Sequence, residues 1–373
     1  MIYLDYSATT PVDKEVLDTF SKVCMEYPGN SNSMHSLGVK SKELEVYATE
    51  EIAKMLKVKP SEVIYTSGAS ESNNTAIKGV CLKHQNRGKH IITTYLEHSS
   101  VIAPLNYLTN LGFEVDFVKI DDNGLVDLDD FKRLIRDDTI LVSICMVDSE
   151  IGLKQPIKEI AKILKDYPKC LLHVDCTQAL GKIPVDLSDI DLASMSGHKI
   201  FGMKGIGLLI KKENVSIEPL IHGGKSTTPF RSGTPALPLI VSMKKAMELM
   251  VPNVKKNYEY VSELNKMVCD MLKTYPLVHI NSTENSMPHT LNFSLRKIKP
   301  ETFLHALDNH EIYISTKSAC SSADSMSNSV FALTKDKELA SHSLRISLSY
   351  KTTKEELVEF FKIFDECYKK LDM

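Results

Sequence analysis

Short runs of aliphatic and β-branched residues alternate with amphipathic stretches along the first two-thirds of the chain. This alternation predicts an α/β fold, with a large domain in which a mostly parallel sheet is covered by helices. Ligands of such sheets bind beyond the carboxyl ends of the strands, so polar residues that follow a strand are candidate site residues. The predicted strands cover residues 62–66, 90–94, 114–118, 140–144, 171–175, 192–195 and 207–210.

The last third of the chain has a different pattern. A long helical periodicity covers about residues 237–275, and strand-like runs follow at 289–295 and 343–348. A final helix is predicted to begin at Lys354. This order of elements indicates a smaller α+β unit.

The length of the chain indicates two domains, because 373 residues exceed what one ordinary hydrophobic core holds. A hydrophobic content of 43% is ample for two cores. We expect residues 12–250 to form the large domain. Residues 1–11 together with 251–373 are expected to form the small domain, so that the N-terminal segment completes the C-terminal unit.

The composition argues against several classes of protein. A formal net charge of -3 does not favour nucleic acid or an anionic membrane as a direct partner. No apolar run reaches membrane-spanning length, and the N-terminus lacks the pattern of a secretory signal. The eight cysteines are dispersed without metal-ligand spacing. We therefore expect a cytoplasmic enzyme with no metal site.

Lys199 is the first candidate for chemistry. It lies in a polar turn between the apolar run 192–195 and the glycine-rich stretch 204–210. A lysine at the end of a buried strand can lose its proton and attack an aldehyde cofactor, which is how pyridoxal 5'-phosphate (PLP) is held. The alternative is an ordinary solvated loop.

Residues 67–76 form a turn of small residues that opens a predicted helix. Free backbone amides and the positive end of the helix dipole make such a turn suitable for a phosphate group. The segment lacks the glycine and lysine patterns of dinucleotide and triphosphate sites, so a single cofactor phosphate is favoured. An ordinary capped helix is the alternative.

Asp175 and His98 each follow a predicted strand. A carboxylate at the end of a buried strand needs a partner, and a protonated pyridine nitrogen is suitable. His98 could stack on a cofactor ring and transfer protons. The alternatives are a helix-capping aspartate and a solvated loop histidine.

Cys320 and Arg345 are the candidates in the last third. Cys320 lies in a serine-rich segment without apolar periodicity, where Lys317 would favour a thiolate. Arg345 interrupts a strand-like run with a side chain suited to binding a carboxylate at two points. A structural salt bridge is the alternative for Arg345.

Taken together and in this order, these motifs resemble the NifS-type cysteine desulfurases of the class V branch of PLP-dependent transferases. The resemblance covers nearly the whole chain and implies fold type I of the PLP-dependent transferases. Its motifs are 3–5, 8–11, Gly29-Asn30, His35-Ser36, 66–74, Glu97-His98, 150–152, 173–178, 196–199, 222–224, 231–234, 318–320 and Arg345.

The resemblance implies a role for individual residues. Lys199 would bind the PLP aldehyde, Asp175 would pair with the pyridine nitrogen, and His98 would stack over the ring. Asn30 and Arg345 would bind the substrate. Gln178 would contact the phenolic oxygen, and Thr234 would come from the second subunit of a homodimer. The full set of other cofactor-binding residues would be Ala69, Ser70, Ser149, Gln178, Ser196, His198 and Thr234.

The implied reaction converts L-cysteine to L-alanine. Cys320 would be catalytic together with Lys199 and His98, because its thiolate would take the sulfur as a persulfide. A second protein would then accept the sulfur. The resemblance leaves the acceptor open between an iron–sulfur scaffold and a tRNA-thiolation enzyme.

Some positions depart from the family pattern. Asp148-Ser149 replaces a usual Asn-Asn pair, and residues 225–228 replace a usual Glu-Arg pair. Ser149 is shorter than asparagine, and Asp148 would repel a substrate carboxylate if it pointed inward. Two alternatives therefore stay open. One is a related PLP reaction, such as that of a selenocysteine lyase, a cysteine desulfhydrase or a class V aminotransferase, and the other is a weakly active homologue that binds partners.

Overall fold

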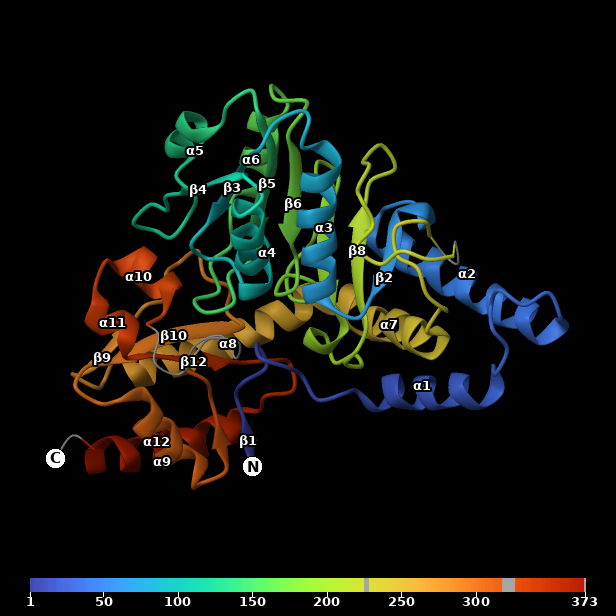
Figure 1. The fold of residues 1–373 in the computed structure, drawn as a ribbon. Coiled ribbons are helices and arrows are strands. Elements are labelled where there is room, and N and C mark those ends of the chain that lie inside the picture. The colour runs from blue at the N-terminus through green and yellow to red at the C-terminus, as the bar shows by residue number, and fades with distance from the viewer. Residues whose placement is uncertain (225–227, 317–325, 372–373) are drawn as a thin grey trace.

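The structure is a computed structural model that describes residues 1–224, 228–316 and 326–371. Its centre is a seven-stranded sheet with the order β2-β8-β7-β6-β5-β3-β4, in which β8 runs antiparallel to both of its neighbours (Figure 1). All the strands predicted for this sheet are present. They are β2 (Val63–Thr66), β3 (His90–Thr94), β4 (Glu114–Val118), β5 (Thr139–Cys145), β6 (Leu171–Asp175), β7 (Leu192–Ser196) and β8 (Gly207–Lys211).

Helices cover both faces of this sheet, which confirms the predicted α/β class. On one face, α3 and α4 pack on aliphatic strand residues such as Ile91 and Leu141. On the other face, α5, α6 and α7 pack on residues such as Val142 and Val174. The bounds of these helices are α3 (Ala69–His84), α4 (Ser99–Thr109), α5 (Leu128–Leu134), α6 (Ile157–Leu164) and α7 (Leu237–Met250).

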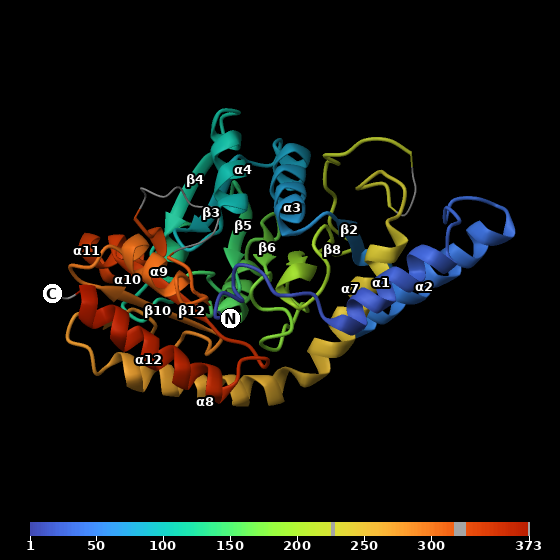
Figure 2. The same ribbon diagram turned by 90° about the horizontal axis from the view of Figure 1, so that it is seen from below.

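The predicted helical stretch 237–275 is two helices rather than one. Pro252 lies in a short 3-10 turn, Val251–Asn253, between α7 and α8 (Val254–Leu272). Proline has no backbone N–H and its ring crowds the preceding turn, so a continuous α-helix is disfavoured there. The two helices lead one after the other from the large sheet to the C-terminal third (Figure 2).

The C-terminal third has its own core, which includes Leu4 near the N-terminus and Phe293, Phe303 and Phe364. A three-stranded antiparallel sheet with the order β12-β10-β9 lies beside it, and β1 pairs in parallel with β11. The limits predicted for the two domains stay a prediction. The elements are β1 (Ile2–Tyr3), β9 (Val278–Ile280), β10 (Thr290–Leu295), α9 (Pro300–Asp308), β11 (Ile312–Tyr313), α10 (Asn328–Thr334), α11 (Lys337–Ser341), β12 (Ser343–Ser347) and α12 (Lys354–Leu371).

Two helices near the N-terminus, α1 (Lys14–Glu26) and α2 (Ser36–Leu56), pack on α7 and extend away from the sheet (Figures 1 and 2). Within the described residues, no helix is both long enough and apolar enough to cross a membrane.

Candidate active site

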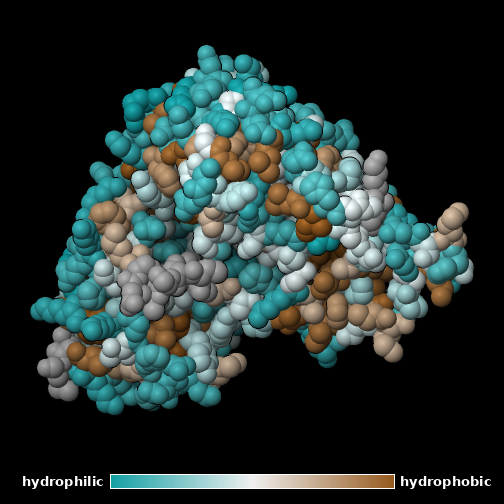
Figure 3. All heavy atoms as spheres, viewed as in Figure 1, coloured by the Kyte–Doolittle hydropathy of each residue, from teal (hydrophilic) through white to brown (hydrophobic). Residues whose placement is uncertain are grey.

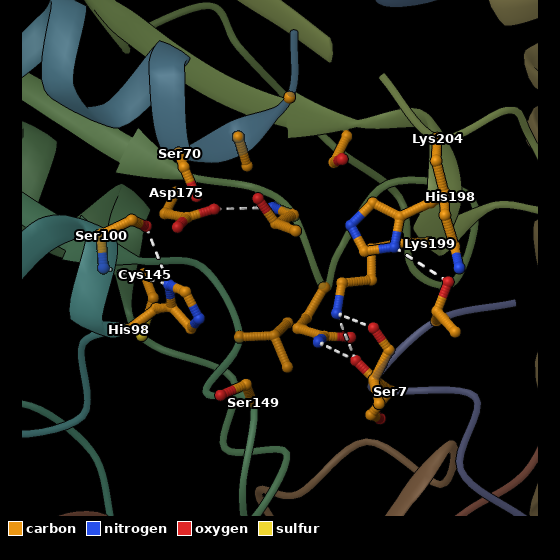
Figure 4. A pocket seen from close by; sticks show the side chains of 18 of the residues that line it. Ser7, Ser70, His98, Ser100, Cys145, Ser149, Asp175, His198, Lys199 and Lys204 are labelled. Atoms are coloured by element: carbon orange, nitrogen blue, oxygen red, sulfur yellow. Dashed lines mark hydrogen bonds between the residues drawn. The ribbon is translucent and has the colours of Figure 1, made fainter. Parts of the chain in front are cut away.

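A cavity of about 410 Å³ lies at the carboxyl ends of the central strands, where polar residues were predicted to meet (Figure 4). Its wall combines residues from the turns after β2, β3, β5, β6 and β7 with the N-terminal segment and β12. Most of the predicted site residues line it. They are Ala69, Ser70, His98, Ser149, Asp175, Gln178, Ser196, His198, Lys199 and Arg345.

Lys199 ends a short 3-10 turn, Gly197–Lys199, directly after β7. Its Nζ donates hydrogen bonds to the backbone oxygens of Ser7, at 2.5 Å, and Ala8, at 2.7 Å. These contacts come from the N-terminal segment, about 190 residues away in sequence. Figure 4 shows the lysine beside Ser7 at the edge of the cavity. The amine is therefore fixed within reach of a bound ligand.

His198, the neighbour of Lys199, is held by the same N-terminal segment. Its Nδ1 lies 3.1 Å from the hydroxyl of Thr9, and its backbone oxygen accepts a hydrogen bond from the backbone N–H of Thr10. Burial, and then the nearby charge of Lys199, lower the pKa of His198 to about 4. The imidazole is thus neutral at pH 7. A neutral imidazole has one N–H and can donate a single hydrogen bond to an anion.

The N-terminus of α3 meets this cavity with unused polar groups. Gly68 is the N-cap, and within the described residues no side-chain capping hydrogen bond is made at this position. The hydroxyls of Ser196 and Thr177 are buried and have no hydrogen-bond partner among the described residues. Buried hydroxyls without partners are costly, and the helix end favours negative charge. The chemistry of this corner therefore fits a phosphate group.

Asp175 ends β6 and is only 6% exposed. Its Oδ2 accepts a hydrogen bond from Asn73 Nδ2 at 2.8 Å, and its Oδ1 accepts one from the backbone N–H of Thr177 at 2.9 Å. Both donors are neutral, so they orient the carboxylate without cancelling its charge. A protonated ring nitrogen in the cavity would supply the opposite charge.

His98 is the N-cap of α4. Its Nδ1 accepts a hydrogen bond from the backbone N–H of Ser100 at 3.1 Å, so the neutral ring carries its proton on Nε2. Burial lowers the pKa of His98, although the charge of Asp175 works against this shift. The ring is therefore a neutral, fixed wall of the cavity, joined through Ser100 and Asn73 to Asp175.

Arg345 comes from the centre of β12 and is 1% exposed. Its Nη2 pairs with Asp5 Oδ1 at 2.8 Å, and its Nη1 donates to the backbone oxygen of Ser149 at 2.9 Å. The salt bridge weighed as an alternative is thus present. Arg345 nevertheless lines the cavity, and its Nε is buried with no hydrogen-bond partner among the described residues.

The two residues at the departure from the family pattern point in different directions. Ser149 lines the cavity and Asp148 does not. The Asp148 carboxylate is fully buried, where it accepts hydrogen bonds from the backbone N–H of Ile151, at 2.5 Å, and the hydroxyl of Ser329 in α10, at 3.0 Å. Burial, and then the charge of Glu150, raise the pKa of Asp148 to about 6. Asp148 therefore does not face a substrate carboxylate in the cavity.

Three predicted residues are not in this wall. Asn30 is exposed in the turn between α1 and α2, and Thr234 lines a separate cavity of about 80 Å³ near Arg231. Cys320 lies outside the described residues. Among the described residues, no group of histidine, cysteine or acidic side chains could hold a metal ion.

Four residues that contribute to the site had no predicted role. Ser7 supplies a carbonyl to Lys199, Thr177 supplies a buried hydroxyl, and Asn73 and Ser100 connect His98 with Asp175. Asn73 lies in a motif that the sequence analysis quoted, but its partner is 102 residues away. Pairings of this kind follow from the fold and leave no local pattern.

The fold and the cavity together define a PLP-dependent transferase of fold type I. A lysine amine, a carboxylate held by neutral hydrogen-bond donors and a helix N-terminus lie around one cavity, and their chemistry suits the aldehyde, ring nitrogen and phosphate of PLP. The residues present therefore fit the predicted cofactor.

Comparison with known proteins gives the family. The model of the family described as "Aminotransferase class-V" matches residues 2–360. A cysteine desulfurase IscS from Dictyoglomus turgidum is 40% identical over 99% of this chain and 95% of its own length. A NifS/IcsS protein homolog from Lactobacillus delbrueckii subsp. bulgaricus is 42% identical over 99% of this chain and 97% of its own length. The chain belongs to the class-V aminotransferase family.

Solved structures agree with this assignment. A "NIFS-LIKE PROTEIN" superposes with a TM-score of 0.94 and 36% identity, covering 99% of this chain and 100% of that one. A structure titled "SspA in complex with cysteine" has a TM-score of 0.83 and 31% identity, covering 95% of this chain and 100% of that one. The resemblance to NifS-type desulfurases and the PLP cofactor predicted from the sequence are confirmed.

Proposed function

We propose that this chain is a PLP-dependent cysteine desulfurase that converts L-cysteine to L-alanine and transfers the sulfur to Cys320. The observation that carries the proposal is the arrangement of Lys199, Asp175, His98 and Arg345 around one cavity. The 40% identity with a cysteine desulfurase over nearly the full length of both chains supports the same reaction.

The cofactor would be held by residues from several turns. Lys199 would bind its aldehyde, Asp175 would keep the ring nitrogen protonated, and His98 would stack on the ring. Bound PLP supplies an electron sink for negative charge that develops on the amino acid. Gln178 would donate to the phenolic oxygen, and the phosphate ligands would be Ala69, Ser70, Ser196 and His198, with Thr177 added from its unpaired hydroxyl.

The substrate would be oriented by its carboxylate. The Arg345 guanidinium is buried, and its Nε has no hydrogen-bond partner among the described residues, so it can bind an anion without leaving the cavity wall. The amine of Lys199 would move protons at the reacting carbon. The Cys320 thiol would take the sulfur, so that L-cysteine and a thiol become L-alanine and a persulfide.

We also propose a homodimer, in which Thr234 and Asn30 would reach the cavity of the partner chain. Support comes from apolar side chains that α1 and α2 expose to solvent, some of which lie at the lower right of Figure 3. A contiguous exposed apolar surface marks an interaction site. These residues are Leu17, Met25, Leu37, Val39, Val46 and Tyr47, and Met34 is exposed in the turn between the two helices.

The partners outside the dimer follow from the reaction. A protein would accept the persulfide sulfur, either an iron–sulfur scaffold or a tRNA-thiolation enzyme, and the protein would act in the cytoplasm. The net charge of -3 argues against nucleic acid or an anionic membrane as a direct partner.

A second candidate function is a PLP reaction on a related amino acid, such as selenocysteine lysis, desulfhydration or transamination. Ser149 is the observation that favours it, because a short hydroxyl lines the cavity where related proteins usually carry a carboxamide. Such a change alters the polar contacts available to the substrate.

The test is a substrate panel with PLP-loaded protein, in which alanine and sulfide are measured in the presence of a reducing thiol. L-Cysteine should give both products, while Lys199→Ala should give neither. The proposal fails if L-cysteine is inert and another amino acid reacts.

A further inference from the structure

Lys182 is a buried lysine behind the cavity wall, and the reaction described above assigns it no role. It is 6% exposed and lies in the turn that follows β6. Burial, and then the charges of Lys199 and Arg345, lower its pKa to about 7. Burial of an amine costs free energy unless hydrogen bonds compensate for the lost contacts with water.

The turn that carries Lys182 brings it close to Gln178, four residues earlier. The backbone winds tightly from Cys176, and Gly181 adopts a positive φ of 71° where a Cβ would meet Met250 and Ile200 at about 3 Å. As a result, Lys182 Nζ donates to Gln178 Oε1 at 2.6 Å.

The other end of the Gln178 amide is also fixed. Its Nε2 donates to the backbone oxygen of Ser7 at 2.9 Å, and Lys199 Nζ donates to the same oxygen at 2.5 Å. Ser7 in turn receives two contacts from the small sheet, because Ser347 Oγ accepts from its N–H and Thr290 Oγ1 lies 3.1 Å from its hydroxyl. The acceptor that Gln178 and Lys199 share is therefore rigid.

These contacts allow one orientation of the amide. Below its pKa of about 7, Lys182 is an ammonium that only donates, and the Ser7 carbonyl only accepts at any pH. A flipped amide would therefore set two donors against each other and two acceptors against each other. One N–H of Gln178 is used by Ser7, and the second N–H is left for the cavity that Gln178 lines.

We propose that Lys182 is a positioning residue for the PLP site, which holds the Gln178 amide with its N–H toward the cavity. The inference rests on the proposed function, because a donor at this place suits the phenolic oxygen of bound PLP. The charge of Lys182 also affects Lys199. The repulsion between two ammonium groups is mutual, so protonated Lys182 disfavours the protonated form of Lys199.

The groups that surround Lys182 set the conditions of the test. They are the cations Lys199 and Arg345 on the cavity side, with His198 and His289 also close enough to feel the charge of Lys182. Burial, and then the charge of Lys182, lower the pKa of His289 to about 3, so this histidine stays neutral through the neutral range.

The experiment compares Lys182→Met with wild type and with Lys211→Met. Lys211 is another buried lysine, which lies in β8 and donates to the backbone oxygens of Lys212 and Val215, and it does not line the cavity. It therefore controls for the loss of any buried lysine. The measurements are the dissociation constant for PLP, the pH midpoint of the visible absorbance of bound PLP, and thermal unfolding.

Lys182→Met should weaken PLP binding by about tenfold and move the pH midpoint upward, since one charge-assisted hydrogen bond and one nearby cation are lost. Lys211→Met should change neither. Lys182→Arg, which keeps a donor and the charge, should recover part of both losses and remains informative if the methionine variant folds poorly.

A double-mutant cycle tests whether Lys182 acts through Gln178. In a Gln178→Leu background, Lys182→Met should weaken PLP binding little further. The proposal would be overturned if the losses of PLP affinity in the two single variants multiplied fully in the double variant. It would also be overturned by a Lys182→Met variant with the PLP affinity and pH midpoint of wild type. Failure of wild type itself to bind PLP would instead contradict the proposed function.

Discussion

Replacement of Asp148 by asparagine should make the protein more stable at neutral pH, and increasingly so as the pH rises. The carboxylate is fully buried and faces α10 rather than the cavity. Asparagine can keep its contacts, because Oδ1 can accept from the backbone N–H of Ile151 and Nδ2 can donate to the hydroxyl of Ser329.

The size of the effect follows from the pKa of Asp148, which burial and Glu150 raise from 3.8 to about 6. The folded state binds more protons than the unfolded state between these values, so the free energy of unfolding falls as the pH rises through this window. Two units at about 1.4 kcal/mol each give a total of ~3 kcal/mol. Roughly half of this, ~1.5 kcal/mol, accrues between about pH 5 and pH 8.

The assay is urea unfolding of the PLP-loaded protein at pH 5 and pH 8, at one protein concentration. Asp130→Asn serves as a control of opposite sign. Although burial opposes it, hydrogen bonds from the Lys119 N–H and the Arg133 guanidinium lower the pKa of Asp130, so its contribution is present above the unfolded pKa and is lost in acid. Asp130→Asn should therefore lose stability at pH 8.

The reasoning about Asp148 is refuted if its asparagine variant gains no stability between pH 5 and pH 8 relative to wild type. A loss of stability at pH 8 would show that the ionised carboxylate is favourable where it lies.

Two further changes have expected outcomes. Ser196→Ala should stabilise the PLP-free protein by up to ~1 kcal/mol in thermal unfolding, because the buried hydroxyl of Ser196 has no partner among the described residues. The same variant should bind PLP more weakly in a titration. Arg345→Lys should raise KM for L-cysteine by about tenfold or more at unchanged PLP occupancy, because lysine lacks the planar fork that binds a carboxylate at two points. Unchanged KM would assign Arg345 to its salt bridge with Asp5 alone.

The large sheet could be predicted because each strand is signalled locally. The predicted runs at 90–94, 114–118 and 171–175 match β3, β4 and β6 to the residue. The break between α7 and α8 could also have been read from Pro252, which sits within the periodic stretch. The local pattern therefore predicts the type of each of these elements and its approximate bounds.

The contacts between distant segments could not be predicted in the same way. Lys199 is held by the carbonyl of Ser7, and Arg345 pairs with Asp5, in each case across the fold. The direction of the Asp148 side chain depends on Ser329 in a helix that the sequence analysis did not foresee. Such pairings are fixed by packing, which leaves no period in the sequence.

The central claim is tested most directly by mass spectrometry of the PLP-loaded protein after a single turnover with L-cysteine, reading both the Cys320 peptide and the small-molecule product. The account predicts one alanine for each added sulfur atom on Cys320, and a Cys320→Ala variant that keeps its PLP but gains no sulfur. Bound PLP with no alanine and no added sulfur would contradict it.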